Sequence, residues 1–261
     1  MALNQPVTVR PFSLTHEEIM TYEPNGTGNG WTHPAYRASA VDIDVGLRQY
    51  MLRVYNYMAA GLAISGLVAY LAMATGFYQQ IAGTPLIWLV MLAPLGALLF
   101  LSVRIEQMNV GTAQAVFWGY AALMGLSLAG IFLVFTDASI ARVFLITAAT
   151  FALTSLYGYT TGRDLSQLGS FLFMGLVGIV LASLVNVFIG SSALQFAISI
   201  IGVIVFTGLT AYDTQRIKEV YLASDPGDVT TKKAIMGALA LYLDFINLFV
   251  MLLQFTGQRR E

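Results

Sequence analysis

The sequence predicts an all-α membrane protein with seven transmembrane helices. Of its 261 residues, 57% are apolar and only 10% are charged, whereas about a quarter of the residues in an average soluble domain are charged. The apolar residues gather in runs of about 20 that carry almost no charge, which is the length a helix needs to cross ~30 Å of hydrocarbon. These runs lie at about 52–75, 86–103, 112–135, 141–161, 168–189, 194–222 and 230–256.

The composition also argues against several kinds of partner and site. The net charge is −1, so the chain has no general basic field that would attract nucleic acid. It contains no cysteine, which excludes disulfides and thiolate metal sites. The first 30 residues lack the basic and apolar regions of a cleavable signal peptide. We therefore expect the first spanning helix to act as the insertion signal, with the lipid bilayer as its surroundings.

Residues 1–45 differ from the rest of the chain because they are polar and rich in proline and glycine, as in "EPNGTGNGW". This composition predicts a flexible N-terminal arm without a core of its own, followed by a transmembrane domain over 46–261. His16 and His33 lie in the arm without partners at ligand spacing. We interpret them as solvated side chains and expect no metal site there.

The distribution of lysine and arginine predicts the orientation in the membrane, since cytoplasmic loops carry an excess of both. Ten basic residues fall on the side of the N-terminus and three on the other side, which places the N-terminus in the cytoplasm. With seven spans, Arg259 and Arg260 would lie outside. A re-entrant last segment that returns both to the cytoplasm remains an alternative. The first group is Arg10, Arg37, Arg48, Arg53, Arg104, Arg163, Arg216, Lys218, Lys232 and Lys233, and the second is Arg142, Arg259 and Arg260.

Glycines inside the predicted spans indicate close packing of helices, because small residues let two backbones approach each other in lipid. We assign them no other role. They are Gly61, Gly66, Gly125, Gly130, Gly175 and Gly178.

Two aspartates lie well inside the predicted spans, Asp213 in "GLTAYDTQRIKEVY" and Asp244 in "LYLDFINLF". We expect a turn at "ASDPGDV", with Asp228 or Thr230 as the N-cap of the last helix. Counted from that turn, the two aspartates differ in level by about five to seven residues, or roughly 8–10 Å. Helix tilt and a water molecule could close much of this gap. We therefore expect both carboxylates to share one site near the cytoplasmic half.

Burial would strongly affect the ionisation of the two paired aspartates. A lone ionised aspartate in mid-membrane costs roughly 2.5–3.5 kcal/mol on insertion scales, so it turns towards the bundle interior and finds a partner. Two carboxylates in one low-dielectric site cannot both ionise cheaply, and they hold a shared proton over some range of pH. Such a pair would act as a proton-operated latch. Once charged, its hard oxygens would also suit Ca²⁺.

Structural roles for the neighbouring polar residues remain open. Arg216 lies three residues after Asp213 and could form an ordinary salt bridge with it. Asp244 has no such basic neighbour, and Asn247 three residues later can only hydrogen-bond to it. Arg104 ends the second predicted span in "LFLSVRIEQMN". We expect its side chain to extend to the lipid headgroups, with an inward reach to a carboxylate as the alternative.

Four stretches carry a resemblance to a known family: "VYNYMAAGLAISGLVAY", "YGYTTGRDLSQLGSFLFMGLVGIVLASLVN", "GVIVFTGLTAYDTQRIK" and "LYLDFINLFVMLL". They resemble the Bax inhibitor-1 family, also called the transmembrane Bax inhibitor motif family, and the resemblance covers about 46–256. It implies six helices wrapped around a central C-terminal helix, and pH-sensitive leak of Ca²⁺ across the membrane. It further implies that Asp213 and Asp244 form the proton sensor. Arg104 is the best match by position to a latch arginine.

The resemblance favours a pH-sensitive Ca²⁺ (cation) leak channel of the bacterial inner membrane, gated by the proton that the two aspartates share. No cofactor is expected beyond Ca²⁺ as the permeant or bound ion. The alternative is a non-transporting regulator of a membrane-bound ATP-dependent protease, which would act through protein contacts of the N-terminal arm.

An enzyme is disfavoured. An intramembrane aspartyl protease would carry its second aspartate in a G-x-G-D stretch, and the bulky "LYLD" takes that place here. The chain also shows no phosphate loop, nucleophile–base set or zinc signature.

Overall fold

The computed structural model describes residues 34–260 and the side chains of 45–260. The chain divides into two units, 1–40 and 41–261, and the second contains the transmembrane helices. Most of the predicted arm, including His16 and His33, lies outside the described residues. Helix α1 already begins at Pro34, within the segment for which the sequence predicts an arm without structure.

The described part of the chain is built from helices. Seven of them, counting short extensions, are long and apolar enough to cross a membrane, and this confirms the predicted fold class. The elements are α1 (Pro34–Ala74), α2 (Phe77–Ala82), α3 (Leu86–Arg104), the 3-10 turn η1 (Ile105–Gln107), α4 (Val110–Leu128), α5 (Ile131–Val134), α6 (Asp137–Thr160), α7 (Ser166–Ile189), α8 (Ser192–Glu219) and α9 (Gly227–Thr256).

Side-chain caps start three of these helices. Asn109, Thr136 and Ser191 accept a hydrogen bond from the backbone N–H three residues later, which satisfies a donor that the first helical turn leaves free. Helix α9 starts differently. It begins at Gly227, directly after Pro226, and has no side-chain cap. The predicted N-cap at Asp228 or Thr230 is therefore wrong.

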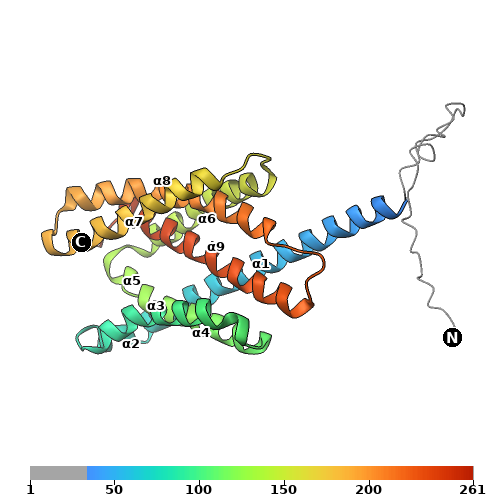
Figure 1. Cartoon of the computed structure of the whole chain (residues 1–261). Coiled ribbons are helices and arrows are strands. Elements are labelled where there is room, and N and C mark those ends of the chain that lie inside the picture. The colour runs from blue at the N-terminus through green and yellow to red at the C-terminus, as the bar shows by residue number, and fades with distance from the viewer. Residues whose placement is uncertain (1–33, 261) are drawn as a thin grey trace, which may run out of the picture. The chain divides into compact units, whose positions relative to one another are not determined.

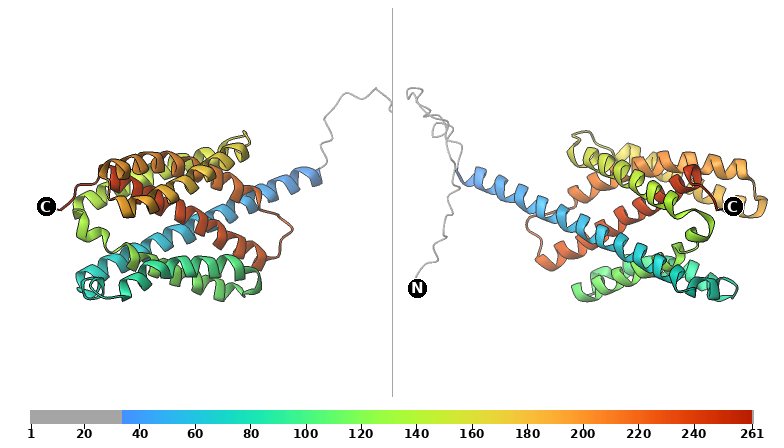
Figure 2. Two further views of the ribbon diagram at one scale, coloured as in Figure 1. Left: turned by 60° about the vertical axis from the view of Figure 1, so that its left-hand side comes forward. Right: turned by 180° about the vertical axis from the view of Figure 1, so that it is seen from behind.

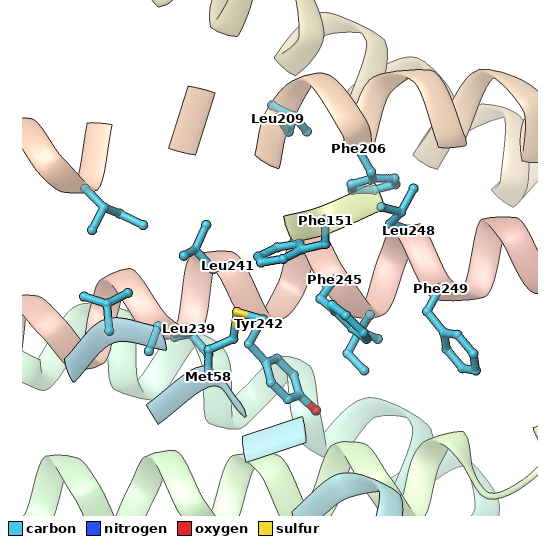
Figure 3. Packing of buried hydrophobic residues seen from close by; sticks show 14 of the residues in the cluster. Met58, Phe151, Phe206, Leu209, Leu239, Leu241, Tyr242, Phe245, Leu248 and Phe249 are labelled. Atoms are coloured by element: carbon cyan, nitrogen blue, oxygen red, sulfur yellow. The ribbon is translucent and has the colours of Figure 1, made fainter. Parts of the chain in front are cut away.

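Helix α9 forms the centre of the bundle, as the resemblance implies. In its most apolar window 61% of the residues are buried, against 39% for α8 and 28% or less for the other spans. It packs on α8, α6 and α4. Its side chains point in several directions, with Leu248 beside Phe206 of α8 and Tyr242 on another side of the helix (Figure 3).

Aromatic and hydroxyl contacts fix α9 against its other neighbours. The ring of Phe245 meets Phe151 of α6 edge-on at 5.6 Å between centroids, a favoured arrangement of two aromatic rings. The Tyr242 hydroxyl lies 2.7 Å from the Ser65 hydroxyl of α1. Ser65 in turn donates to the carbonyl oxygen of Ala121 in α4. This contact joins three helices through polar groups that find their partners inside the bundle.

One end of the bundle carries most of the basic residues, and we call it the basic end. Several of these residues join helices there: Lys218 donates to the carbonyl oxygen of Tyr159 at 2.9 Å, Lys232 donates to that of Glu106 at 3.0 Å, and Arg53 donates to the Thr231 hydroxyl at 2.8 Å.

The C-terminal segment lies at the opposite end. Gln258 accepts a hydrogen bond from the backbone N–H of Thr136, and the Arg260 guanidinium lies 2.6 Å from Asp137 at the start of α6. Helix α9 therefore runs from the basic end to the far end of the bundle. This geometry does not agree with a re-entrant last segment.

Four of the six glycines expected to pack closely do so, namely Gly61, Gly125, Gly130 and Gly175. A Cβ at each would approach a neighbouring side chain or backbone within 3.2 Å. At Gly66 and Gly178 a Cβ would meet nothing within 4 Å, so the prediction of close packing is wrong for these two.

We expect Gly125→Ala to destabilise the protein, because the new Cβ would lie 2.7 Å from the Ser65 Cα and push α4 away from α1. Overpacking of this kind costs about 1–3 kcal/mol, so the midpoint of thermal unfolding should fall by several degrees. Gly178→Ala is the matched control and should leave the midpoint unchanged or raise it, since alanine favours helix. Equal effects of the two variants would contradict the close approach.

The absence of native cysteine allows a direct test of the number of crossings. Single cysteines at Arg163 and Gln258 should react with a membrane-impermeant maleimide from opposite sides of sealed vesicles, because the two positions lie at opposite ends of the bundle. Labelling of both from one side would show that α9 re-enters and does not cross.

Candidate functional site

The candidate site is the place where α8 and α9 bring two aspartates together. The side chains of Asp213 and Asp244 line the same groove and lie close enough to interact with each other. An ionised carboxylate only accepts hydrogen bonds, so a bond between two carboxyl groups requires that one of them carries a proton. The structure therefore brings together the two residues that the sequence analysis singles out.

Sequence counting gives a poor account of how they meet. Helix α8 ends at Glu219 and α9 starts at Gly227, so Asp244 lies further from the connecting turn than expected. The two helices are not parallel. Helix α9 leaves the turn at a distance from α8 and crosses the bundle obliquely (Figures 1 and 2). This tilt brings Asp244 alongside Asp213.

Asp244 is the more deeply buried of the two. It is 5% exposed, and its Oδ2 has no hydrogen-bond partner among the described residues. A buried ionised group without a donor is strongly destabilised. We therefore expect the two carboxyl groups to share a proton, which would allow α9 to keep an acid in an apolar surrounding.

Two cavities reach this pair. The first, which we call the vestibule, opens at the basic end and has a volume of about 630 Å³. The second, which we call the lateral groove, lies between α7, α8 and α9 and has a volume of about 640 Å³. Asp213, Arg216 and Ala240 line both cavities. Asp213 is thus accessible from the basic end and from the side of the bundle, whereas Asp244 lines only the lateral groove.

Arg216 and Asn247 lie near the pair in different ways. Arg216 lines both cavities beside Asp213, but the ion pairs found within residues 45–260 do not include it. The ordinary salt bridge that its spacing suggests is therefore not formed. Asn247 lines the lateral groove together with Asp244, so its amide is in a position to contact a molecule bound there.

Arg104 is not brought to the pair. It is exposed at the end of α3, and its guanidinium donates to the side-chain oxygen of Gln107 at 3.2 Å. It lines neither the vestibule nor the lateral groove. The turn η1 follows directly after it, so the side chain stays outside the bundle at the level of the basic end.

Sequence reasoning missed the walls of the vestibule. Tyr50 of α1, Glu106 of η1, and Lys232 and Lys233 at the start of α9 all line it. The hydroxyl of Tyr50 is buried without a partner in the described part of the chain. Lys232 and Lys233, directly before an apolar run, could have indicated this wall from the sequence. No sequence pattern connects Tyr50 to α9.

Two carboxyl groups alone provide few ligands for a metal ion. No group of three or more His, Cys, Asp or Glu side chains that could hold a metal ion occurs among residues 45–260, and Ca²⁺ usually takes six to eight oxygen ligands. The arrangement therefore suits brief contact with a cation that keeps most of its water, and not tight storage.

Asp164, in the loop between α6 and α7, provides a contrast outside the spans. It accepts a hydrogen bond from the backbone N–H of Ser166 at 2.8 Å, and this bond lowers the pKa of its carboxyl group. Asp164 is fully exposed. Its carboxyl therefore stays ionised over a wide range of pH, and Asp164 is a suitable reference position.

Comparison with known proteins gives the family. The family described as "Inhibitor of apoptosis-promoting Bax1" matches residues 47–261, which cover six spans in full and the first from residue 47 onwards. The chain belongs to the Bax inhibitor-1 family. It is 47% identical over 226 residues to the inner membrane protein YbhL of Escherichia coli, covering 85% of this chain and 97% of the relative.

Two further proteins are similar to the chain over nearly the same length. An uncharacterized protein of Rickettsia prowazekii is 48% identical over 84% of this chain and 93% of its own. An uncharacterized membrane protein of Streptococcus pyogenes is 37% identical over 82% of this chain and 95% of its own. Together with the seven apolar spans, these matches show an integral multi-pass membrane protein.

The shared proton can be detected by infrared difference spectroscopy of the membrane-embedded protein. We expect a band from a protonated carboxyl group that weakens as pH rises and disappears in Asp244→Asn, because the remaining Asp213 then meets an amide and no longer needs the proton. Asp164→Asn should leave the band unchanged. Its absence in the wild-type protein throughout the pH range in which the fold persists would contradict the geometry.

Proposed function

We propose that the protein is a pH-sensitive Ca²⁺ leak channel in which the proton shared by Asp213 and Asp244 holds the closed state. The proposal is carried by one observation, the approach of two carboxyl groups on adjacent spans, one of which also lines the vestibule. Membership of the Bax inhibitor-1 family supports it.

The latch acts through the position of α9. While the pair carries one proton, its hydrogen bond holds α8 and α9 together. When the proton leaves, two like charges face each other, and at 4 Å their repulsion amounts to about 4 kcal/mol for an effective dielectric constant of 20. Every 1.4 kcal/mol changes an equilibrium tenfold, so this repulsion is large enough to favour a state with the helices apart.

The barrier in the closed state is apolar. Beyond the pair, towards the far end of the bundle, α9 carries Phe245, Leu248 and Leu252, all buried. Packed apolar side chains of this kind exclude water and therefore block ions. Separation of α8 from α9 at the pair would loosen this packing and extend the vestibule across the membrane.

The charged pair would also act on the permeant ion. Two ionised carboxylates attract a divalent cation, and Asn247 adds an amide oxygen in the same groove. Because this is fewer oxygens than a tight Ca²⁺ site provides, the ion binds weakly enough to leave again, as conduction requires. The same carboxylates would serve as proton sensor and as transient Ca²⁺ ligands.

We place the protein in the bacterial inner membrane, the location that the name of YbhL gives for that relative. Its basic end, and with it the N-terminus, would face the cytoplasm by the positive-inside rule. The vestibule then opens to the cytoplasm. A proton leaving the pair through the vestibule would report the pH of that compartment.

The function can be tested in proteoliposomes loaded with a Ca²⁺ indicator. Wild-type flux should rise with pH as the shared proton leaves. Asp244→Asn should give a low flux that does not change with pH, because the amide N–H donates to Asp213 at every pH and keeps the latch closed. Asp164→Asn, an exposed loop position, should titrate like the wild type.

Two outcomes would overturn the proposal. An Asp244→Asn flux that follows the wild-type pH curve would show that the pair is not the sensor. Wild-type flux no greater than that of empty liposomes would show that the protein is not a channel. It would favour the alternative function as a protease regulator, whose predicted contacts lie in the N-terminal arm.

A further inference from the structure

We propose that the lateral groove binds a zwitterionic aminophospholipid of the phosphatidylethanolamine type, with the phosphate at Arg216 and the ammonium at Asp213. This proposal does not depend on ion conduction. It rests on the exposure, the charge pattern and the unpartnered oxygen of the groove.

The groove faces the hydrocarbon of the membrane. Its wall on α7 includes Phe173 and Met174, which are 61% and 65% exposed. In a bilayer such side chains contact lipid, and a cleft between them and α8 is filled by lipid because water is not stable beside apolar surface at this depth. An acyl chain is the natural occupant of the apolar length between Phe173 and Leu209.

One end of the groove is charged in a way that matches a zwitterion. Arg216 and Asp213 both line it, and three residues along α8 separate them by about 4.5 Å of helix rise. The phosphate and ammonium of an ethanolamine headgroup are joined by a two-carbon link, so they can reach an arginine and an aspartate at this spacing. Arg216 lies nearer the basic end, at the depth where a lipid phosphate is expected.

The carboxyl pair favours a primary ammonium over other headgroups. With one shared proton the pair carries a single negative charge, which one ammonium balances. An ammonium has three N–H donors, and Oδ2 of Asp244 lacks a hydrogen-bond partner within residues 45–260. A choline headgroup has no N–H to offer. A glycerol headgroup leaves the pair without a cation.

Because of where its headgroup lies, a bound lipid would affect the proposed channel. Asp213 and Arg216 also line the vestibule, so the bound headgroup lies at the boundary between the two cavities. Its ammonium and a Ca²⁺ ion would compete for the same carboxylate. A lipid in the groove would therefore oppose entry of the cation from the vestibule.

Native mass spectrometry of the full chain in detergent tests the proposal. The protein is mixed with phosphatidylethanolamine, phosphatidylcholine or phosphatidylglycerol of identical acyl chains at equal concentration. Retention of the ethanolamine lipid should exceed that of the other two by about tenfold, the factor expected from one charge-assisted hydrogen bond.

Two variants test which residue binds the ammonium of the headgroup and which binds its phosphate. Asp213→Asn should lower retention of the ethanolamine lipid to the level of the choline lipid, and Arg216→Gln should weaken retention of both. Arg163→Gln and Asp164→Asn, which lie in the loop and outside the groove, should leave the preference intact. Thermal unfolding of each variant reports whether it is folded, and the comparison of lipids on the wild-type chain needs no variant.

Equal retention of the ethanolamine and choline lipids by the wild type would overturn the proposal, as would a preference that survives both groove substitutions. Displacement of the lipid by soluble phosphoethanolamine at equal concentration would show that the charged end alone binds, and would overturn the assignment to a lipid. None of these measurements involves Ca²⁺ flux, so this proposal and the channel can fail separately.

Discussion

The structure depends on how a carboxyl group is accommodated on a helix that is buried on nearly all sides. Asp244 is 5% exposed, and its apolar neighbours on α9 cannot stabilise a charge. The partner it finds is Asp213 of α8, itself an acid. A hydrogen bond between two acids exists only while one proton is present. In the proposed latch, the contact between the two helices at this level therefore depends on the protonation of the pair.

The oblique path of α9 connects this local contact to the rest of the bundle. The same helix packs on α8, α6 and α4, and its Tyr242 hydroxyl meets Ser65 of α1 two residues before Asp244. A shift of α9 at the pair would therefore act on aromatic and hydroxyl contacts with most of its neighbours. This arrangement explains how a change at one carboxyl group can alter packing over the whole width of the membrane domain.

The sequence predicted the class of fold and the important residues better than their geometry. Long apolar runs identify spans because the thickness of the bilayer fixes their length, and an acid inside such a run is rare enough to mark a site. No sequence pattern indicates the tilt of a helix in a comparable way. The expected levels of Asp213 and Asp244 rested on two parallel helices and on a cap at Asp228 or Thr230, and the start of α9 at Gly227 contradicts the cap.

Contacts between distant segments could not be predicted from local sequence patterns, because they also depend on how the helices cross. Tyr50 and Glu106 meet the start of α9 in the vestibule only because α1, η1 and α9 come together at the basic end. Gly66 and Gly178 look like the packing glycines elsewhere in the chain, yet they face open space. A position on a helix face can be read from the sequence, whereas what covers that face depends on the crossing angles of the whole bundle.

The most direct test of the account is the separation of the Asp213 and Asp244 carboxyl groups in experimental structures of the membrane-embedded protein at two pH values. The account predicts hydrogen-bonding distance at the lower pH and a longer separation, with α9 displaced from α8, at the higher pH. An unchanged hydrogen-bonding distance at both values, with the infrared band of the protonated carboxyl lost at the higher one, would contradict it.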